Sequence, residues 1–342
     1  MQSFKKALFV SLAFVLCVII ISALLVEPLF INRPNYFQDS EARNELSGTI
    51  DFAISGSSYS YRAFDPNIID GVLGTSGYNF SGARMTMAGR YEMLKLETER
   101  NPIKTVVFDM SCDTLYRNRD EEGPEGDLYL LSRIDSPLER LKYASQQIRL
   151  DEYFSVYYYF LKSGISAIIN PDESGWTDSD RVECRGYYPR WMNDMSMTAA
   201  EYAEIRNTES METEIYAENL EYLNKIIELC KEKDIRLIFV TVPVSNQTLC
   251  RVDNLDVPRE KYAEIAEANG IEFYDLNLLK NRSELFPEET AFFDDSHLST
   301  YGSATFSSVF AELMQTVNSG GDVTDMFFSS YKELDANSVY SK

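Results

Sequence analysis

The sequence predicts an α/β domain with a mostly parallel sheet that helices cover on both faces. Two observations predict this architecture: short apolar runs lack the period of a helix, and amphipathic helical segments alternate with them along the chain. A third is composition, since 44% hydrophobic residues over 342 positions supply enough apolar side chains for a sizeable core.

Four segments predict strands. The first is GTIDFAISGSS, an apolar run that ends in Gly and Ser, as a buried strand does where it enters a turn. The other three cover residues 103–110, 235–244 and 271–276.

Helices are predicted between and after these strands. Apolar residues recur at spacings of three and four from Tyr216 to Cys230, and Gly270 ends a second helix that starts at Pro258. One apolar face of a third helix near the C-terminus is made by Phe306, Val309, Phe310, Leu313 and Val317.

Residues 113–200 interrupt the alternation. We expect a largely helical insertion there, with helices near 128–147 and 151–162, on the C-terminal edge of the second strand, where α/β folds place ligand-binding loops. The expected organisation is therefore an N-terminal segment and anchor (1–30), a linker (31–47), one α/β domain (48–317) and a C-terminal tail (318–342).

The first thirty residues predict a membrane anchor. No charge occurs from Ala7 to Val26, and about 20 apolar residues suffice for a transmembrane helix. Lys5 and Lys6 precede the run. They predict a single-pass protein of the cell membrane with a cytoplasmic N-terminus and an extracytoplasmic domain. A cleaved signal peptide is the alternative, but its apolar region is usually shorter and ends in an A-x-A-like site, which LLVEPLF lacks.

Charge and cysteine content exclude several classes of protein. The formal net charge of -22 repels nucleic acid backbones, so nucleic acid is not an expected partner. The chain has 5 cysteines but no C-x-x-C or Cys/His cluster, so we expect neither a metal site nor a cofactor. An extracytoplasmic location permits one disulfide without identifying the pair.

The only histidine, His297, must carry any histidine-dependent chemistry. It lies in FFDDSHLSTYG, three residues after Asp294, and a carboxylate can hold an imidazole in the tautomer that a base requires. The alternative is that Asp294, Asp295, Ser296 or Ser299 caps the following helix and His297 is an incidental neighbour.

A serine stands at the predicted end of the first strand. Ser58 follows Gly56 and Ser57, and the end of a first parallel strand exposes such a hydroxyl. Serine is a weak nucleophile until a base takes its proton and a carboxylate orients that base. Gly-Ser-Ser is also ordinary turn chemistry, so the nucleophile hypothesis depends on both motifs together.

These two motifs resemble those of the SGNH, or GDSL-like, hydrolase superfamily. FAISGSSYSYRAFDP is similar to its Gly-x-Ser nucleophile block, and DDSHLSTYG to its D-x-x-H block before the last helix. The resemblance covers about residues 49–317 apart from the insertion. It implies a flavodoxin-like three-layer sandwich and a triad of Ser58, His297 and Asp294.

Two other blocks of the superfamily supply the oxyanion hole, and here the chain departs from the pattern. GYNFSGARM offers Ser81 or Gly82 for the usual glycine amide, but VVFDMSCD has no asparagine in the third block. Either Ser111, Arg84 or Asn246 replaces that donor, or the activity is weak or specialised. For Asn246 the alternative is an ordinary turn residue. Arg62 could orient a substrate, but we expect an ion pair with a nearby aspartate, Asp65 or Asp70.

The predicted function is that of a serine esterase or O-acyltransferase. The anchor and the motif G-S-S-x-x-Y-R-x-F-D-P resemble those of the membrane-tethered branch of the superfamily, which includes DltD-like and PatB-like surface proteins. This resemblance implies that the substrates are acyl esters of an envelope polysaccharide and that a membrane-bound O-acyltransferase is a partner. The alternative is a non-catalytic accessory protein of such an acyltransferase, which the missing asparagine favours.

Overall fold

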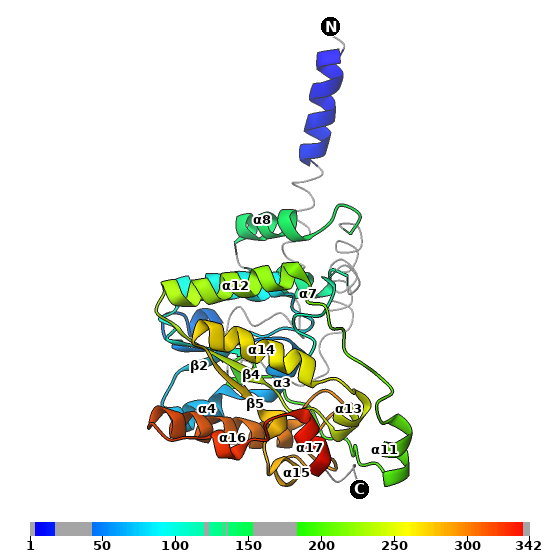
Figure 1. The fold of residues 1–342 in the computed structure, drawn as a ribbon. Coiled ribbons are helices and arrows are strands. Elements are labelled where there is room, and N and C mark those ends of the chain that lie inside the picture. Colours follow the sequence, from blue (N-terminus) through cyan, green and yellow to red (C-terminus); the bar gives the residue numbers. More distant parts are fainter. Residues whose placement is uncertain are drawn as a thin grey trace.

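The structure, a computed structural model, describes residues 4–17, 43–119, 123–131, 133–134, 136–152 and 183–337. Within these ranges the chain forms an α/β body around one parallel sheet (Figure 1). The α/β class and the parallel sheet predicted from the sequence are confirmed.

The sheet has five strands in the order β2-β1-β3-β4-β5, all parallel. Their bounds are β1 Phe52–Ser55, β2 Gly77–Asn79, β3 Thr105–Asp109, β4 Arg236–Thr241 and β5 Glu272–Asp275. The four predicted strands are present. The unpredicted β2 is an edge strand that pairs with β1 and is too short, at 3 residues, to show a period.

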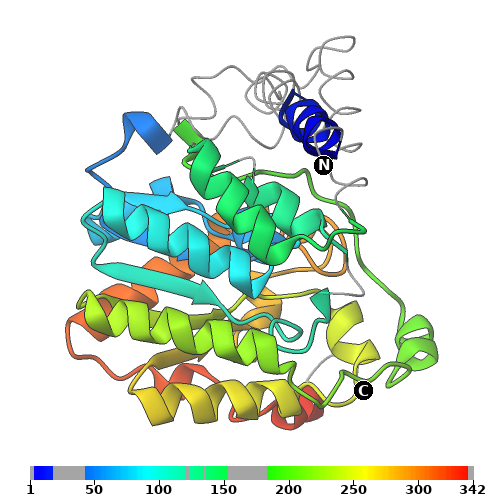
Figure 2. The ribbon, with the colours of Figure 1, turned by 90° about the horizontal axis from the view of Figure 1, so that it is seen from above.

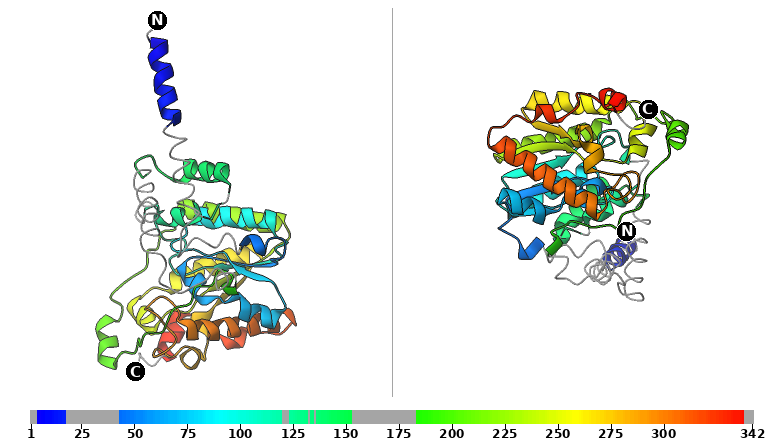
Figure 3. Two further views of the ribbon diagram at one scale, coloured as in Figure 1. Left: turned by 180° about the vertical axis from the view of Figure 1, so that it is seen from behind. Right: turned by 90° about the horizontal axis from the view of Figure 1, so that it is seen from below.

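Helices cover both faces of the sheet because the side chains of a strand alternate between the faces. Ala53 and Val106 pack with the face made by α5 (Met87–Arg100), α12 (Ala217–Glu232) and α14 (Asp256–Asn269), which Figure 2 shows from above. Phe52 and Ile54 pack with the opposite face, made by α3 (Ser58–Ala63), α4 (Pro66–Leu73) and α16 (Thr300–Asn318). In the view from below in Figure 3, α16 (orange) runs beside α4 (blue).

Shorter helices complete the body. They are α7 (Glu125–Leu131), α8 (Pro137–Gln147), α11 (Ala199–Ile205), α13 (Asn246–Arg251), α15 (Arg282–Leu285), α17 (Tyr331–Asn337) and the 3₁₀ turns η1 (Leu276–Leu278) and η2 (Thr324–Met326). The helix expected near 128–147 is divided into α7 and α8, where Ser136 caps α8 and Pro137 begins it. The helix expected over 151–162 lies almost wholly outside the described residues.

The predicted anchor is described only in part. Residues 4–17 are helical, and the remainder of the apolar run, from residue 18 on, lies outside the described residues. Within the described ranges, no helix has both the length and the apolar character that crossing a bilayer requires.

The C-terminal tail packs on the domain as far as it is described. The Phe328 amide donates to the Leu278 carbonyl, the Tyr331 amide donates to Asp256, and Leu334 is buried. All five cysteines lie in the described ranges and are free thiols, so none of the possible disulfides forms here: Cys17, Cys112, Cys184, Cys230 and Cys250.

The strand order fixes where a ligand site is expected. The connection after β1 runs to β2 on one side, and the connection after the neighbouring strand β3 runs to β4 on the other side. In a doubly wound sheet with this order, ligands bind at the carboxyl ends of the strands at that switch point. The segments that follow β1 and β3 begin with Gly56 and Met110, and the predicted nucleophile lies in the first of them.

Candidate active site

A tight turn after β1 presents Ser58. Gly56 has no room for a side chain, because a Cβ atom there would lie 2.2 Å from Ser60 Oγ and 2.6 Å from Asp109 Cβ. Ser57 is the N-cap of α3 and accepts the Tyr59 amide at 3.4 Å. Ser58 is therefore the first residue of the helix, and capping is done by its neighbour.

The second part of the site is the loop before α16. Asp294 Oδ1 accepts the backbone amides of Ser296 at 2.9 Å and His297 at 2.8 Å, which folds the loop around the carboxylate. Ser299, not Asp294, caps α16 and accepts the Gly302 amide. The capping alternative for Asp294 is therefore wrong, and its carboxylate lies at the histidine ring.

Ser58, His297 and Asp294 form a continuous chain of polar contacts. His297 Nε2 lies 2.8 Å from Ser58 Oγ, and Nδ1 lies 2.8 and 2.9 Å from the two Asp294 oxygens. The predicted proximity of serine and histidine is confirmed. The His297 side chain is 19% exposed and that of Asp294 is 40% exposed, so the chain of contacts reaches the surface.

Electrostatics keep Asp294 ionised. Burial by itself would raise the pKa of Asp294, but the hydrogen bond and charge of His297 and the two backbone amides lower it below its ordinary value. An ionised carboxylate at Nδ1 favours the tautomer with its proton on Nδ1, which leaves Nε2 free to accept the Ser58 proton.

Tyr59 is a site residue that sequence reasoning missed. Its ring stacks on the His297 ring, with centroids 5.3 Å apart and an interplanar angle of 27°. Burial, and then the Asp113 carboxylate, raise the pKa of Tyr59 well above its ordinary value. The only signal in the sequence is its position directly after Ser58. Tyr59 thus fixes the plane of the imidazole.

Asp109 anchors the nucleophile turn from beneath. It ends β3, and its carboxylate accepts Ser111 Oγ at 2.7 Å and Ser57 Oγ at 3.4 Å. Burial raises the pKa of Asp109, although the Arg90 guanidinium opposes the shift. Asp109, in the segment where the superfamily has an asparagine, therefore positions the turn that follows β1.

Four of the expected oxyanion donors are engaged elsewhere. The Ser81 amide donates to Asn79 Oδ1 at 3.1 Å, and the Gly82 amide to the Gly56 carbonyl at 3.2 Å. Ser111 Oγ donates to Asp109. Asn246 lies after β4, on the expected rim of the sheet; its side-chain oxygen accepts Arg282 and its backbone amide donates to Glu288. The Ser81 and Gly82 amides and the Ser111 hydroxyl thus have other acceptors in this arrangement.

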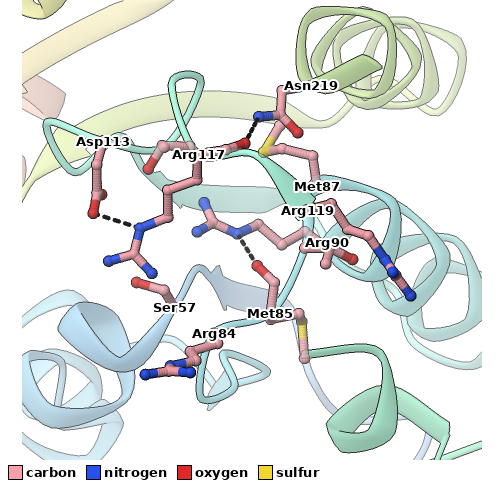
Figure 4. A pocket seen from close by; sticks show the side chains of 11 residues that line it. Ser57, Arg84, Met85, Met87, Arg90, Asp113, Arg117, Arg119 and Asn219 are labelled. Atoms are coloured by element: carbon pink, nitrogen blue, oxygen red, sulfur yellow. Dashed lines mark hydrogen bonds and ion pairs between the residues drawn. The ribbon is translucent and has the colours of Figure 1, made fainter. Parts of the chain in front are cut away.

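Arg84, the fifth expected donor, lines a pocket beside the nucleophile turn. In the view of Figure 4, Ser57 lies between the guanidinium groups of Arg84 and Arg117, and Arg90 extends toward the same space. Arg84 has a left-handed backbone (φ 49), and its carbonyl is so close to Gly126 of α7 that a Cβ atom there would lie 1.8 Å away. The insertion thus holds the Arg84 turn in an uncommon conformation.

The expected ion pair of Arg62 is wrong. Asp70 pairs with Arg185 at 2.7 Å, and Asp65 accepts the Asn67 amide as the N-cap of α4. The Arg62 guanidinium instead lies over the Phe293 ring, 5.1 Å from its centroid. Its position one helical turn after Ser58 places a buried cation beside the loop that carries Asp294.

No protein-family model matches the sequence, and no curated protein matches it significantly. The resemblance to the SGNH hydrolases therefore depends on the two motifs of this chain, and the activity that it implies is a proposal.

Proposed function

We propose that the protein is a serine esterase or O-acyltransferase that acts on acyl esters of a cell-envelope glycan. One observation carries the proposal: Ser58 Oγ, the His297 ring and the Asp294 carboxylate lie in line at distances of 2.8 to 2.9 Å. A hydroxyl, a base and a carboxylate in this order are the parts that acyl transfer through a serine requires.

In the proposed reaction, Ser58 Oγ attacks the carbonyl carbon of the ester while His297 Nε2 takes the serine proton. Asp294 stabilises the resulting imidazolium. His297 then gives the proton to the leaving sugar oxygen, and the acyl group remains on Ser58. Water or a second sugar hydroxyl attacks this acyl-enzyme, with His297 again as the base, and the two cases are esterase and transferase.

The negative charge on the carbonyl oxygen needs a donor beside Ser58. We assign this role to Arg84, because it lines the pocket at Ser57 and its turn is held in place by α7. The apolar run over residues 7–26 supports anchoring in the membrane, and the triad would then face the cell envelope.

The test uses the full-length chain purified in detergent. A serine-directed phosphonate should label Ser58, as mass spectrometry of the digest can verify, and p-nitrophenyl acetate should be cleaved. Ser58→Ala and His297→Ala should each abolish both signals. Labelling without ester turnover would favour a transferase whose acyl-enzyme waits for a sugar acceptor.

The adjacent hydroxyl is a built-in control for the same experiment. Label on Ser57 instead of Ser58 would contradict the assignment of the nucleophile. A wild-type chain that resists the probe and leaves esters intact, even with a membrane-bound acyltransferase supplied, would support the accessory-protein alternative.

A further inference from the structure

The end of the insertion crosses the loop that carries the triad acid and base. The Tyr188 amide donates to the Tyr61 carbonyl at 2.8 Å, and the Asn193 amide to the Phe292 carbonyl at 3.0 Å. The Met195 amide donates to Glu288. We call residues 187–195 the strap. These bonds hold the strap between α3 and the segment before Asp294.

Two cations, Arg62 of α3 and Arg190 of the strap, lie over the ring of Phe293. The guanidinium carbons of Arg62 and Arg190 lie 5.1 and 5.5 Å from the centroid of that ring. Arg62 is 9% exposed, and its Nε and Nη1 atoms have no hydrogen-bond partner among the described residues; the same holds for Arg190 Nε. Neither guanidinium has a carboxylate within ion-pair distance in the described ranges, which hold pairs for many other arginines.

Such a pair is unusual in a chain with 54 acidic and 32 basic residues. Arg62 also lies over the Tyr61 ring at 5.5 Å and Arg190 over the Tyr188 ring at 5.2 Å, but aromatic faces offset only part of the cost of burying a cation without a carboxylate. Elsewhere the protein has carboxylates in excess, so the absence of one at this point leaves a local positive potential. An anion from outside the chain would complete the arrangement.

Two exposed aromatic residues follow Arg190 and Thr300 in the chain. The Thr300 amide and hydroxyl donate to the Arg190 carbonyl at 2.7 and 2.8 Å. These bonds bring together the backbone segments that continue with Trp191 and with Tyr301. Trp191 is 79% exposed and Tyr301 is 54% exposed. Large aromatic rings left in solvent mark binding surfaces, and a flat ring packs against the C–H face of a pyranose.

We propose that Arg62, Arg190, Trp191 and Tyr301 form a subsite for an anionic sugar of the glycan substrate. The planar guanidinium fork suits a carboxylate or phosphate group, and the rings suit the sugar to which it is attached. The proposal rests on the proposed function, because Arg62 lies one turn after Ser58 and Phe293 directly precedes Asp294. A sugar held here would present a neighbouring ester to Ser58, while the acidic remainder of the surface repels the polymer.

The test measures binding without catalysis. The parent protein is the full-length chain in detergent with Ser58→Ala, and with Trp176→Phe so that Trp191 is the single remaining tryptophan of the 2. Galacturonic acid oligomers, glycerol phosphate oligomers and neutral dextran oligomers are titrated while Trp191 fluorescence is recorded. We expect a saturable change with an anionic oligomer and none with dextran, and the tighter anionic oligomer identifies carboxylate or phosphate as the preferred group.

Variants test the cations one at a time. Arg190→Gln and, as a second variant, Arg62→Gln should weaken binding of the anionic oligomer about tenfold, the usual effect of losing one charge-assisted hydrogen bond. Arg236→Gln is the matched control, since this arginine lies at the N-terminal end of β4, away from the carboxyl ends of the strands, and pairs with Glu272. It should bind as the parent does.

Three results would overturn the subsite: no saturable change with either anionic oligomer, equal binding of dextran, or unchanged binding by Arg190→Gln. Because the parent lacks the Ser58 hydroxyl, the two proposals fail separately. Binding without phosphonate labelling of the wild-type chain would support the subsite and contradict the proposed enzyme. Labelling without binding would support the enzyme and contradict the subsite.

Discussion

Replacing Asp294 with asparagine should disable the base while leaving the loop folded. Asp294 Oδ1 accepts the amides of Ser296 and His297, and the carbonyl of an asparagine can take over both bonds. Its NH₂ group then occupies the place of Oδ2, 2.9 Å from His297 Nδ1, and competes there with the carbonyl oxygen at 2.8 Å. A donating NH₂ at Nδ1 favours the tautomer with the ring proton on Nε2, which cannot accept the Ser58 proton.

The expected loss is large because the wrong tautomer removes the base altogether. In Ser-His-Asp triads this substitution lowers kcat by about 10⁴, equivalent to about 5 kcal/mol of activation free energy. Stability should change little, since both backbone hydrogen bonds persist and the Asp294 side chain is 40% exposed. The lowered pKa of Asp294 stabilises the folded chain at neutral pH, and this stabilisation is lost only as the pH falls through that pKa.

The assay compares rates of p-nitrophenyl acetate cleavage by full-length chains, or rates of phosphonate labelling if the ester is not turned over. Asp295→Asn is the matched control, because this neighbouring carboxylate pairs with Arg251 at 2.7 Å and makes no contact with the His297 ring among the described residues. It should keep a rate within about threefold of wild type. An Asp294→Asn chain with more than a tenth of the wild-type rate would refute the tautomer reasoning.

Four further predictions follow from single features. Gly56→Ala should destabilise the fold by a few kcal/mol and abolish labelling, because its Cβ has no space; Gly71→Ala, which meets nothing within 4 Å in α4, should instead raise the melting temperature. Burial raises the pKa of Glu288 from 4.5 to about 7, so between these values the folded chain holds a proton that the unfolded chain releases; stability falls as the pH rises through this window and levels off above it. Glu288→Gln should therefore raise the melting temperature more at pH 8 than at pH 5, by up to about 3 kcal/mol in free energy, and an equal shift at both values would contradict this. Arg84→Gln should lower the rate of ester cleavage about a hundredfold if Arg84 binds the oxyanion, and a loss below threefold would assign that role elsewhere. A chain that begins at Asn32 should leave the membrane fraction on ultracentrifugation while the full chain remains in it, because the apolar run is removed; retention would indicate a second contact with the membrane.

The sheet was predictable where its strands are long and wholly buried. β3 and β4 are continuous apolar runs because helices cover both faces, and such runs are visible without an alignment. β2 was missed because three residues at the edge of the sheet show no period, and its pairing with β1 is a tertiary contact. The break between α7 and α8 was also missed, but here the sequence does carry a signal: Ser136 and Pro137 are typical of the start of a helix.

The proximity of Ser58, His297 and Asp294 was predictable because each belongs to a local motif, although Ser58 and His297 are separated by 239 positions. Tyr59 and Arg190 have no such motif, and their positions at the site depend on how α3, the strap and the loop before α16 pack together. Arg62 was assigned a sequence neighbour as partner, but Asp70 is taken by Arg185 from the insertion. Short-range charge pairing is a weak guide when a distant cation competes for the same acid.

The replacement of the expected asparagine by Asp109 changes how the oxyanion can be stabilised. A carboxylate accepts hydrogen bonds, and Asp109 uses this capacity to hold the hydroxyls of Ser57 and Ser111, so it gives the turn rigidity and supplies no donor. A charged acid beneath the nucleophile would also oppose a developing negative charge. Burial raises the pKa of Asp109 and the Arg90 guanidinium opposes that shift, and the pocket at the same turn is lined by Arg84, Arg90 and Arg117. A site that exchanges an amide donor for a carboxyl anchor therefore needs a cation nearby, and for this reason we infer stabilisation by guanidinium in place of the usual side-chain amide.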